Sequence, residues 1–152
     1  MSENKPDYYN NLDKTYHKIW KLLEIGLSNR DDPFHLPAFI CNNQNSASGR
    51  IVVLRGVSKE NKNLWFHSDI RSSKISDLNN NKDASFLIYD PKNKFQIRLL
   101  TTIKMHHNDP ISTQAWNNLK PMSKICYQIS QAPGTQLSDP FKVTNTPERN
   151  NE

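Results

Sequence analysis

The sequence predicts a mainly β fold, an antiparallel barrel with accompanying helices. Short apolar runs rich in Val, Ile and aromatic residues recur along the middle of the chain, each bounded by polar turn residues, and this pattern is typical of strands. One short helical segment interrupts them, whereas a doubly wound parallel sheet would alternate strands and helices regularly. With 152 residues, the chain has room for one hydrophobic core rather than two.

An amphipathic helix is expected near the N-terminus, over residues 8–28. Apolar residues recur there at spacings of three and four, as they do on the buried face of a helix: Leu12, Tyr16, Ile19, Leu23 and Leu27. The polar residues 29–32 and then Pro33 end the pattern, so the helix stops before them.

Five strands are expected after this helix, over residues 37–42, 49–57, 64–68, 84–89 and 95–105. Polar residues 43–49 connect the first two, and a charged hairpin loop at 58–63 connects the next two. Residues 72–80 form the inserted helix, with Ser72 as its N-cap. Pro110 opens a later helix whose inner face carries Trp116 and Leu119.

The composition excludes several classes of protein. The two cysteines, Cys41 and Cys126, are far apart, which excludes a disulfide framework and a cysteine zinc site, and both are expected to be buried. The five histidines show no metal-ligand spacing, so no metal is expected. No apolar run approaches the roughly 20 residues of a membrane helix, and because the first residues lack an apolar segment, no secretory signal is expected. We expect a cytoplasmic protein without a membrane partner.

The chain carries a formal net charge of +5, from 20 Lys and Arg against 15 Asp and Glu. Such a surplus favours phosphate-bearing ligands. The basic residues do not cluster with aromatic residues in a nucleic-acid-binding motif, so no nucleic-acid partner is expected. The apolar pattern fades near the end, so we expect one domain over residues 1–136 and a disordered tail over residues 137–152.

The densest group of functional residues lies where the third strand meets the inserted helix. Arg71 and Lys74 stand at a helix N-terminus, where cations oppose the helix dipole unless an anion lies between them. The hydroxyls of Ser68, Ser72 and Ser73, together with the first backbone N–H groups of the helix, suit a phosphate monoester. A capped helix with a charged first turn is the alternative, and the sequence pattern leaves both open.

Two further strand patterns carry candidate residues. Arg50 and Arg55 flank an apolar run, and their separation of five places them on opposite faces of a continuous strand. Gln96 and Arg98 share one face of the last strand, opposite an apolar face formed by Phe95, Ile97 and Leu99. Solvated strand ends and the wet face of a sheet are the alternatives.

These residues, taken in order, resemble the flavin-binding split barrel of pyridoxamine 5'-phosphate oxidase-like proteins. The resemblance rests on four stretches: Arg50-Ile-Val-Val-Leu-Arg55, Leu64-Trp-Phe-His-Ser-Asp69, Arg71-Ser-Ser-Lys74 and Gln96-Ile-Arg98. Trp116 and the stretches 121–124 and 132–134 are similar to a branch of the family without a settled substrate. The likeness covers about residues 33–136 and implies a six-stranded Greek-key split barrel with FMN at a homodimer interface.

The resemblance also implies roles for single residues. Arg50 and Lys74 would hold the FMN phosphate with Ser72 and Ser73, and Arg71 would replace a family arginine that is Ser73 here. The other implied FMN contacts are Arg50, Ile51, Val52 and Val53 along the ring edge, His67 and Ser68 at the ring or ribityl chain, and Gln96 as a hydrogen-bonding amide. Arg55 falls where the oxidases carry a substrate-contacting lysine.

The function expected from this resemblance is an FMN-dependent oxidoreductase with an unknown small-molecule substrate. No nucleophile is needed, because the flavin carries out the redox chemistry. An FMN-binding protein without turnover is the first alternative, since nothing in residues 138–152 matches the last strand of the family and the barrel is expected to be incomplete. A haem-binding split barrel is the second.

Overall fold

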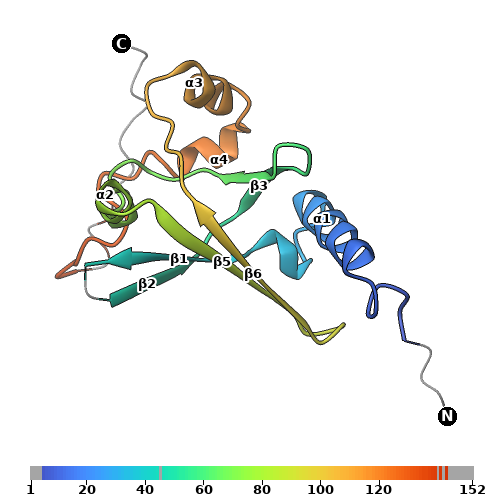
Figure 1. Ribbon diagram of the computed structural model, residues 1–152. Helices are drawn as coiled ribbons and strands as arrows, with labels where there is room; N and C mark the ends of the chain where they lie inside the picture. Colours follow the sequence, from blue (N-terminus) through green and yellow to red (C-terminus); the bar gives the residue numbers. More distant parts are fainter. Residues whose placement is uncertain (1–4, 45, 140, 142, 144–152) are drawn as a thin grey trace. The chain divides into compact units, whose positions relative to one another are not determined.

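The computed structural model describes residues 5–44, 46–139, 141 and 143 (Figure 1). Its elements, in chain order, are α1 (Leu12–Ser28), η1 (Pro33–His35), β1 (Ala38–Asn43), β2 (Ser46–Ile51), β3 (Leu54–Ser58), β4 (Asn63–Phe66), α2 (Ser73–Asn80), β5 (Asp83–Asp90), β6 (Phe95–Thr102), α3 (Pro110–Asn117) and α4 (Pro121–Ile125). The tail expected over residues 137–152 lies outside the described residues, apart from 137–139, 141 and 143.

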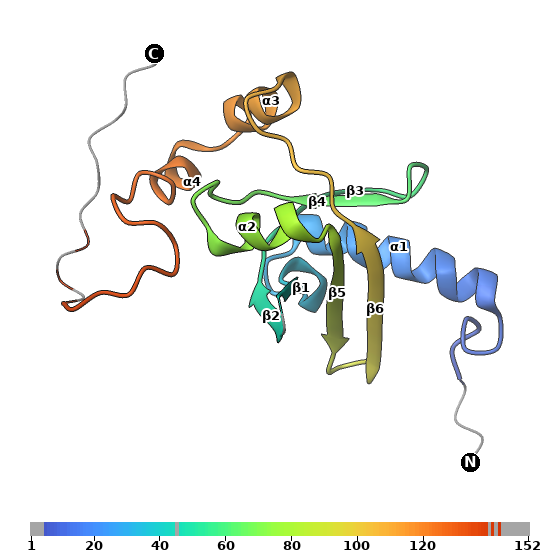
Figure 2. The same cartoon turned by 60° about the vertical axis from the view of Figure 1, so that its left-hand side comes forward.

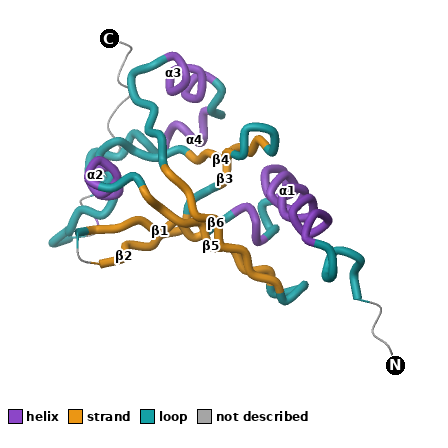
Figure 3. The backbone as a smooth tube through the Cα atoms, viewed as in Figure 1, coloured by secondary structure: helices purple, strands orange, loops and turns teal. Residues whose placement is uncertain are grey.

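The strands form two sheets. One has four strands in the order β2-β1-β5-β6, and the other pairs β3 with β4 in antiparallel fashion. β5 and β6 are joined by a short turn and run side by side in opposite directions (Figures 2 and 3). The prediction of a mainly β fold with antiparallel sheets and helices is confirmed. Within the described residues, the two sheets do not close into one barrel.

The chain divides into two compact units that alternate along the sequence. The first unit is made of Met1–Ile40, Ala47–His67 and Ala84–Thr101, and the second of Cys41–Ser46, Ser68–Asp83 and Thr102–Glu152. The candidate residues are therefore divided between two units, and each unit is described separately below.

The single strand predicted over residues 49–57 is wrong, because β2 and β3 belong to different sheets. The chain leaves β2 at Val52, whose N–H donates to the Pro37 carbonyl at 3.0 Å instead of continuing a strand ladder. A β-bulge follows, since Leu54 pairs with Phe66 and Gly56 with Trp65. The extra residue in this bulge is Arg55, so counting five positions from Arg50 does not decide which way its side chain faces.

The buried face of α1 also differs from the predicted stripe. Leu12 is 88% exposed and Tyr16 is 40% exposed, whereas Trp20, Leu22, Leu23 and Gly26 are buried. The reason is a close approach: a Cβ on Gly26 would lie 2.6 Å from the carbonyl carbon of Phe34 in η1. Only the face that carries this glycine can pack so closely against η1.

Aromatic and aliphatic residues fill the core of the first unit. Phe39, Phe66 and Phe86 form one group, with ring centroids 5.0 to 5.9 Å apart. A second cluster joins α1, η1 and the strands through Trp20, Leu22, Leu23, Phe34, Leu54, Ile88 and Ile97. These contacts fix β3, β4 and β6, the strands that carry or adjoin the candidate residues of this unit.

Two helices of the second unit, α3 and α4, are less buried than expected. α3 and α4 contain no buried residue, and Trp116 is 42% exposed rather than turned inward. Its ring meets that of Tyr127 edge-on, and Lys124 Nζ lies 5.2 Å from its centroid. Cys41 is buried as predicted, but the prediction for Cys126 is wrong: it caps the exposed helix α4 and is itself exposed.

Candidate functional site

A cluster of hydroxyls and one ammonium group forms at the start of α2, in the second unit. Lys74 Nζ donates to Ser68 Oγ at 2.9 Å and to Ser72 Oγ at 2.8 Å. Ser72 is buried, Ser68 and Lys74 are half-buried, and Ser73 is exposed. We call Ser68, Ser72, Ser73 and Lys74 the serine–lysine cluster.

The sequence around α2 leaves the positive end of this helix without a side-chain cap. Ser72 has extended backbone angles, φ −67° and ψ 140°, and its side chain makes no capping hydrogen bond. No acidic residue lies in the first turn of the helix. Ser72 Oγ instead accepts a hydrogen bond from Lys74 Nζ. A helix N-terminus, hydroxyl groups and a cation thus lie together here, and each of them favours the binding of an anion.

A second cation at this position, Arg71, is occupied by a carboxylate. Its Nη2 lies 2.6 Å from Asp69 Oδ2 and its Nε lies 3.0 Å from Asp69 Oδ1. These hydrogen bonds, followed by the charges of Arg71 and Lys74, lower the pKa of Asp69 below its usual value, although burial opposes the shift. The anion that offsets Arg71 at the helix terminus is therefore Asp69.

The guanidinium of Arg71 also reaches a distant part of the same unit. Nη1 donates to the Ser130 carbonyl at 3.2 Å, and Nη2 donates to the Ile129 carbonyl at 3.0 Å. Sequence reasoning placed Arg71 among the FMN ligands and missed these partners. The opposite charges of Asp69 and Arg71, two residues apart, were the one signal that could have suggested their pairing.

In the first unit, Arg50 lies on β2, and its Nη2 donates to Ser48 Oγ at 2.6 Å. The three residues after it differ in exposure: Ile51 is exposed, Val52 is buried and Val53 is half-buried. The backbone of residues 50–53 thus passes from one sheet to the other. This is the segment that the resemblance places along the edge of the flavin ring.

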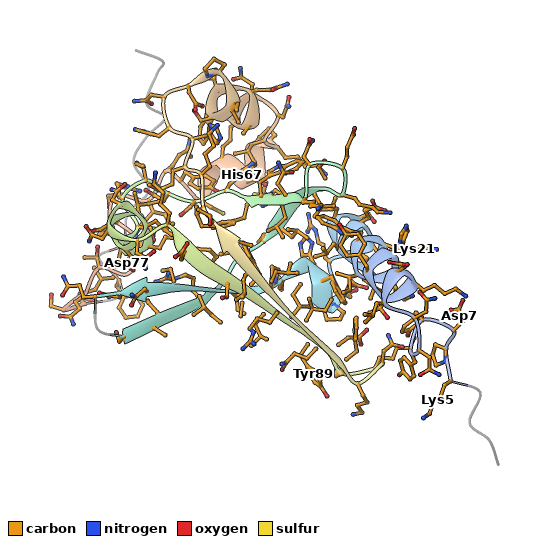
Figure 4. The ribbon with its side chains drawn as sticks, in the orientation of Figure 1. Lys5, Asp7, Lys21, His67, Asp77 and Tyr89 are labelled. Atoms are coloured by element: carbon orange, nitrogen blue, oxygen red, sulfur yellow. The ribbon has the colours of Figure 1, made fainter. Side chains whose placement is uncertain are left out.

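His67 follows β4 directly and is labelled in Figure 4. Among the described residues, its Nδ1 is the one buried side-chain nitrogen or oxygen without a hydrogen-bond partner. Burial, followed by the positive charge of Arg55, lowers the pKa of His67 below its usual value of 6.5. A neutral imidazole with an unsatisfied buried nitrogen is suited to a polar ligand atom.

Gln96 lies on the exposed face of β6. Exposure alternates along this strand, with Gln96 and Arg98 exposed, Ile97 buried, and Phe95 and Leu99 half-buried. The prediction that Gln96 and Arg98 share one face is confirmed. β6 stands at one end of the four-stranded order, so one of its edges has no neighbouring strand among the described residues.

The structure thus brings the candidate residues together in two groups. Ser68, Ser72 and Lys74 are in contact in the second unit, next to Arg71, which is paired with Asp69. In the first unit, Arg55 is close enough to His67 to shift its pKa. The sequence predicts that one ligand contacts both groups, and this stays a prediction.

The titration of His67 gives a testable pH dependence. Because its pKa is lower in the folded protein, the unfolded chain binds a proton at higher pH than the folded one. Its contribution to stability is therefore complete above pH 6.5 and decreases as the pH falls below that value. The free energy of unfolding, measured with urea at pH values above and below 6.5, should depend less on pH in His67→Gln than in the unmodified protein. An identical pH dependence in both proteins would contradict this assignment.

Neither a metal site nor a membrane helix is found in the part of the chain that the structure describes. No group of three or more His, Cys, Asp or Glu side chains is placed to hold a metal ion. Likewise, none of the described helices combines the length and the apolar character needed to cross a membrane.

Comparisons with known proteins agree with the fold. A family model described as "Pyridoxamine 5'-phosphate oxidase, FMN-binding domain" matches residues 18–107. A similar solved structure is that of a pyridoxamine 5'-phosphate oxidase-related, FMN binding protein from Nostoc punctiforme PCC 73102. Its TM-score is 0.59 at 14% sequence identity, over 90% of this chain and 70% of that one. No curated protein matches the sequence of this chain.

Proposed function

The chain belongs to the pyridoxamine 5'-phosphate oxidase FMN-binding domain family. We propose that it binds FMN and acts as an FMN-dependent oxidoreductase. The observation that carries the proposal is the serine–lysine cluster, where Lys74 Nζ contacts Ser68 and Ser72 beside the uncapped start of α2. An ammonium, hydroxyls and helix N–H groups match the three acceptor oxygens of a phosphate monoester.

The proposed ligand residues have the chemistry that FMN requires. Ser68, Ser72, Ser73 and Lys74 would bind the phosphate, and Arg50 would add a second charge. His67 would direct its buried Nδ1 toward the ligand, which would end its unpartnered state. The backbone of Ile51–Val53 and the amide of Gln96 would border the ring. When bound, FMN supplies the electron-accepting and electron-donating ring of the reaction.

The same proposal includes a homodimer built on a six-stranded Greek-key split barrel. A second copy of the chain would cover exposed apolar side chains of the four-stranded sheet, among them Ile51 at 61%, Tyr89 at 52% and Leu100 at 79%. Light scattering of the FMN-loaded protein at micromolar concentration should give the mass of two chains. A monomer that retains FMN would refute the dimer.

The absorption spectrum of the purified protein tests the choice of cofactor. FMN binding predicts the two visible bands of a bound flavin, and release by denaturation should yield FMN rather than riboflavin. A Soret band would instead indicate haem. Purified protein that has neither band, and that does not bind added FMN, would refute the proposed function.

A further inference from the structure

Four of the five N–H groups of the Arg71 guanidinium donate within the second unit. All three of its nitrogens donate: Nε to the Asp69 carboxylate, Nη2 to Asp69 and to the Ile129 carbonyl, and Nη1 to the Ser130 carbonyl. If this guanidinium gripped a phosphate with two N–H groups, it would have to give up at least one of these bonds.

Asp69 is the centre of the turn that precedes α2. Its carboxylate accepts the backbone N–H of Arg71 at 2.8 Å, and its carbonyl accepts the backbone N–H of Ser72 at 3.1 Å. The Ser68 hydroxyl also donates to that carbonyl at 3.3 Å. Asp69 therefore sets the relative positions of Ser68 and Ser72, whose hydroxyls both accept from Lys74.

The carboxylate of Asp69 would otherwise disturb an anion site. Its side chain is only 10% exposed, and it interacts electrostatically with Lys74. An unneutralised carboxylate there would compete with a phosphate for the ammonium group and repel the phosphate itself. The bidentate contact with Arg71 neutralises it, and the bonds to residues 129 and 130 hold the guanidinium in place.

We propose that Arg71 is a positioning residue that acts through Asp69. It orders the turn of residues 68–72 and neutralises its carboxylate, so that the serine–lysine cluster can bind the FMN phosphate, and it is not itself a phosphate ligand. This inference rests on the proposed function. The sequence assigns Arg71 to the FMN ligands, and the inference replaces that role. It also gives residues 129 and 130 a part in the phosphate site, because their carbonyls hold the Arg71 guanidinium.

The test compares FMN and riboflavin affinity, measured by flavin fluorescence, for Asp69→Asn, Arg71→Gln and the double variant. A positioning role predicts that each single variant weakens FMN binding about tenfold, and that the double variant is no worse than the single ones, because the two residues act as one unit. Riboflavin lacks the phosphate, so its affinity should change less than about twofold. A general loss of stability would not change the ratio of the two affinities.

A direct phosphate ligand predicts the opposite result for Asp69→Asn, since removing the competing carboxylate would leave FMN affinity unchanged or increase it. That outcome overturns the inference. Asp109→Asn is the matched control, because Asp109 caps α3 in the same unit and should leave the ratio unchanged. If Asp69→Asn does not fold, Arg71→Lys replaces it as the test. A lysine keeps the charge that a direct phosphate ligand needs, but it lacks the planar fork that binds Asp69 and two carbonyls. A positioning role therefore predicts a lower FMN affinity for Arg71→Lys, and unchanged affinity would contradict it.

The outcomes also separate this inference from the proposed function. An unmodified chain that does not bind FMN overturns the proposed function and the inference together. Normal FMN binding by the unmodified chain, with unchanged binding by Asp69→Asn, overturns the inference alone.

Discussion

The double variant Arg50→Ala, Lys74→Ala is expected to lose FMN binding while keeping its fold. Each side chain would supply a charge-assisted hydrogen bond to the phosphate, and such bonds contribute roughly 1.5–3 kcal/mol each. The two losses together predict an affinity about 10²-fold to 10⁴-fold weaker. Neither residue belongs to the hydrophobic core, so thermal unfolding should remain cooperative.

A matched control is Lys21→Ala with Lys82→Ala. Like the first pair, these two cations come one from each unit, and their removal changes the net charge by the same amount, but both are exposed and lie outside the candidate site. The control should retain FMN affinity within about threefold. Equal losses in both double variants would show that total charge, and not the proposed site, attracts the ligand.

Pyridoxamine 5'-phosphate is expected to be a poor substrate for the FMN-loaded protein. This substrate brings a second phosphate, which needs its own cationic group beside the flavin. Arg50 and Lys74 are assigned to FMN, and Arg71 is occupied by Asp69 and two carbonyls. Arg55, exposed at the bulge in β3, is left as the candidate, and it stands where the resemblance places a lysine.

The expected turnover is below about 10⁻² s⁻¹, because a loss of a few kcal/mol from the non-reacting part of a substrate also slows the chemical step. Oxygen consumption and pyridoxal 5'-phosphate formation measure it. Arg55→Lys is the informative comparison, since restoring a lysine should increase kcat/KM if this position contacts the substrate. Turnover of about 1 s⁻¹ or faster by the unmodified protein would contradict the expectation.

The sequence predicted those strands whose pattern is local. Phe95–Leu99 in β6 alternate between apolar and polar residues, and their burial follows this alternation, whereas the apolar Leu100 that follows is exposed. The run at residues 49–57 is different, because its β-branched residues suit any strand and do not show that two sheets share it. The hydrogen bond from Val52 to Pro37 that ends β2 joins residues 15 positions apart, which strand propensity does not detect.

The same limit applies to α1 and to the candidate site. Periodicity alone suggested the stripe from Leu12 to Leu27, but the approach of Phe34 to Gly26 selects a different face. Ser68, Ser72 and Lys74 lie within seven residues, so their grouping could be predicted from local sequence. The carbonyl partners of Arg71 lie 58 and 59 positions away. Every residue has a backbone carbonyl, so the residue types at these positions could not reveal the contacts.

The most direct test of the central claim, that the serine–lysine cluster holds the FMN phosphate, is an equilibrium titration of the flavin-free protein with FMN and with riboflavin. The two ligands differ only in the phosphate, so their affinity ratio isolates its contribution. We predict that FMN binds at least about 100-fold more tightly, and that Lys74→Ala removes about tenfold or more of this preference. Equal affinity for the two flavins, or a preference that Lys74→Ala leaves intact, would contradict the claim.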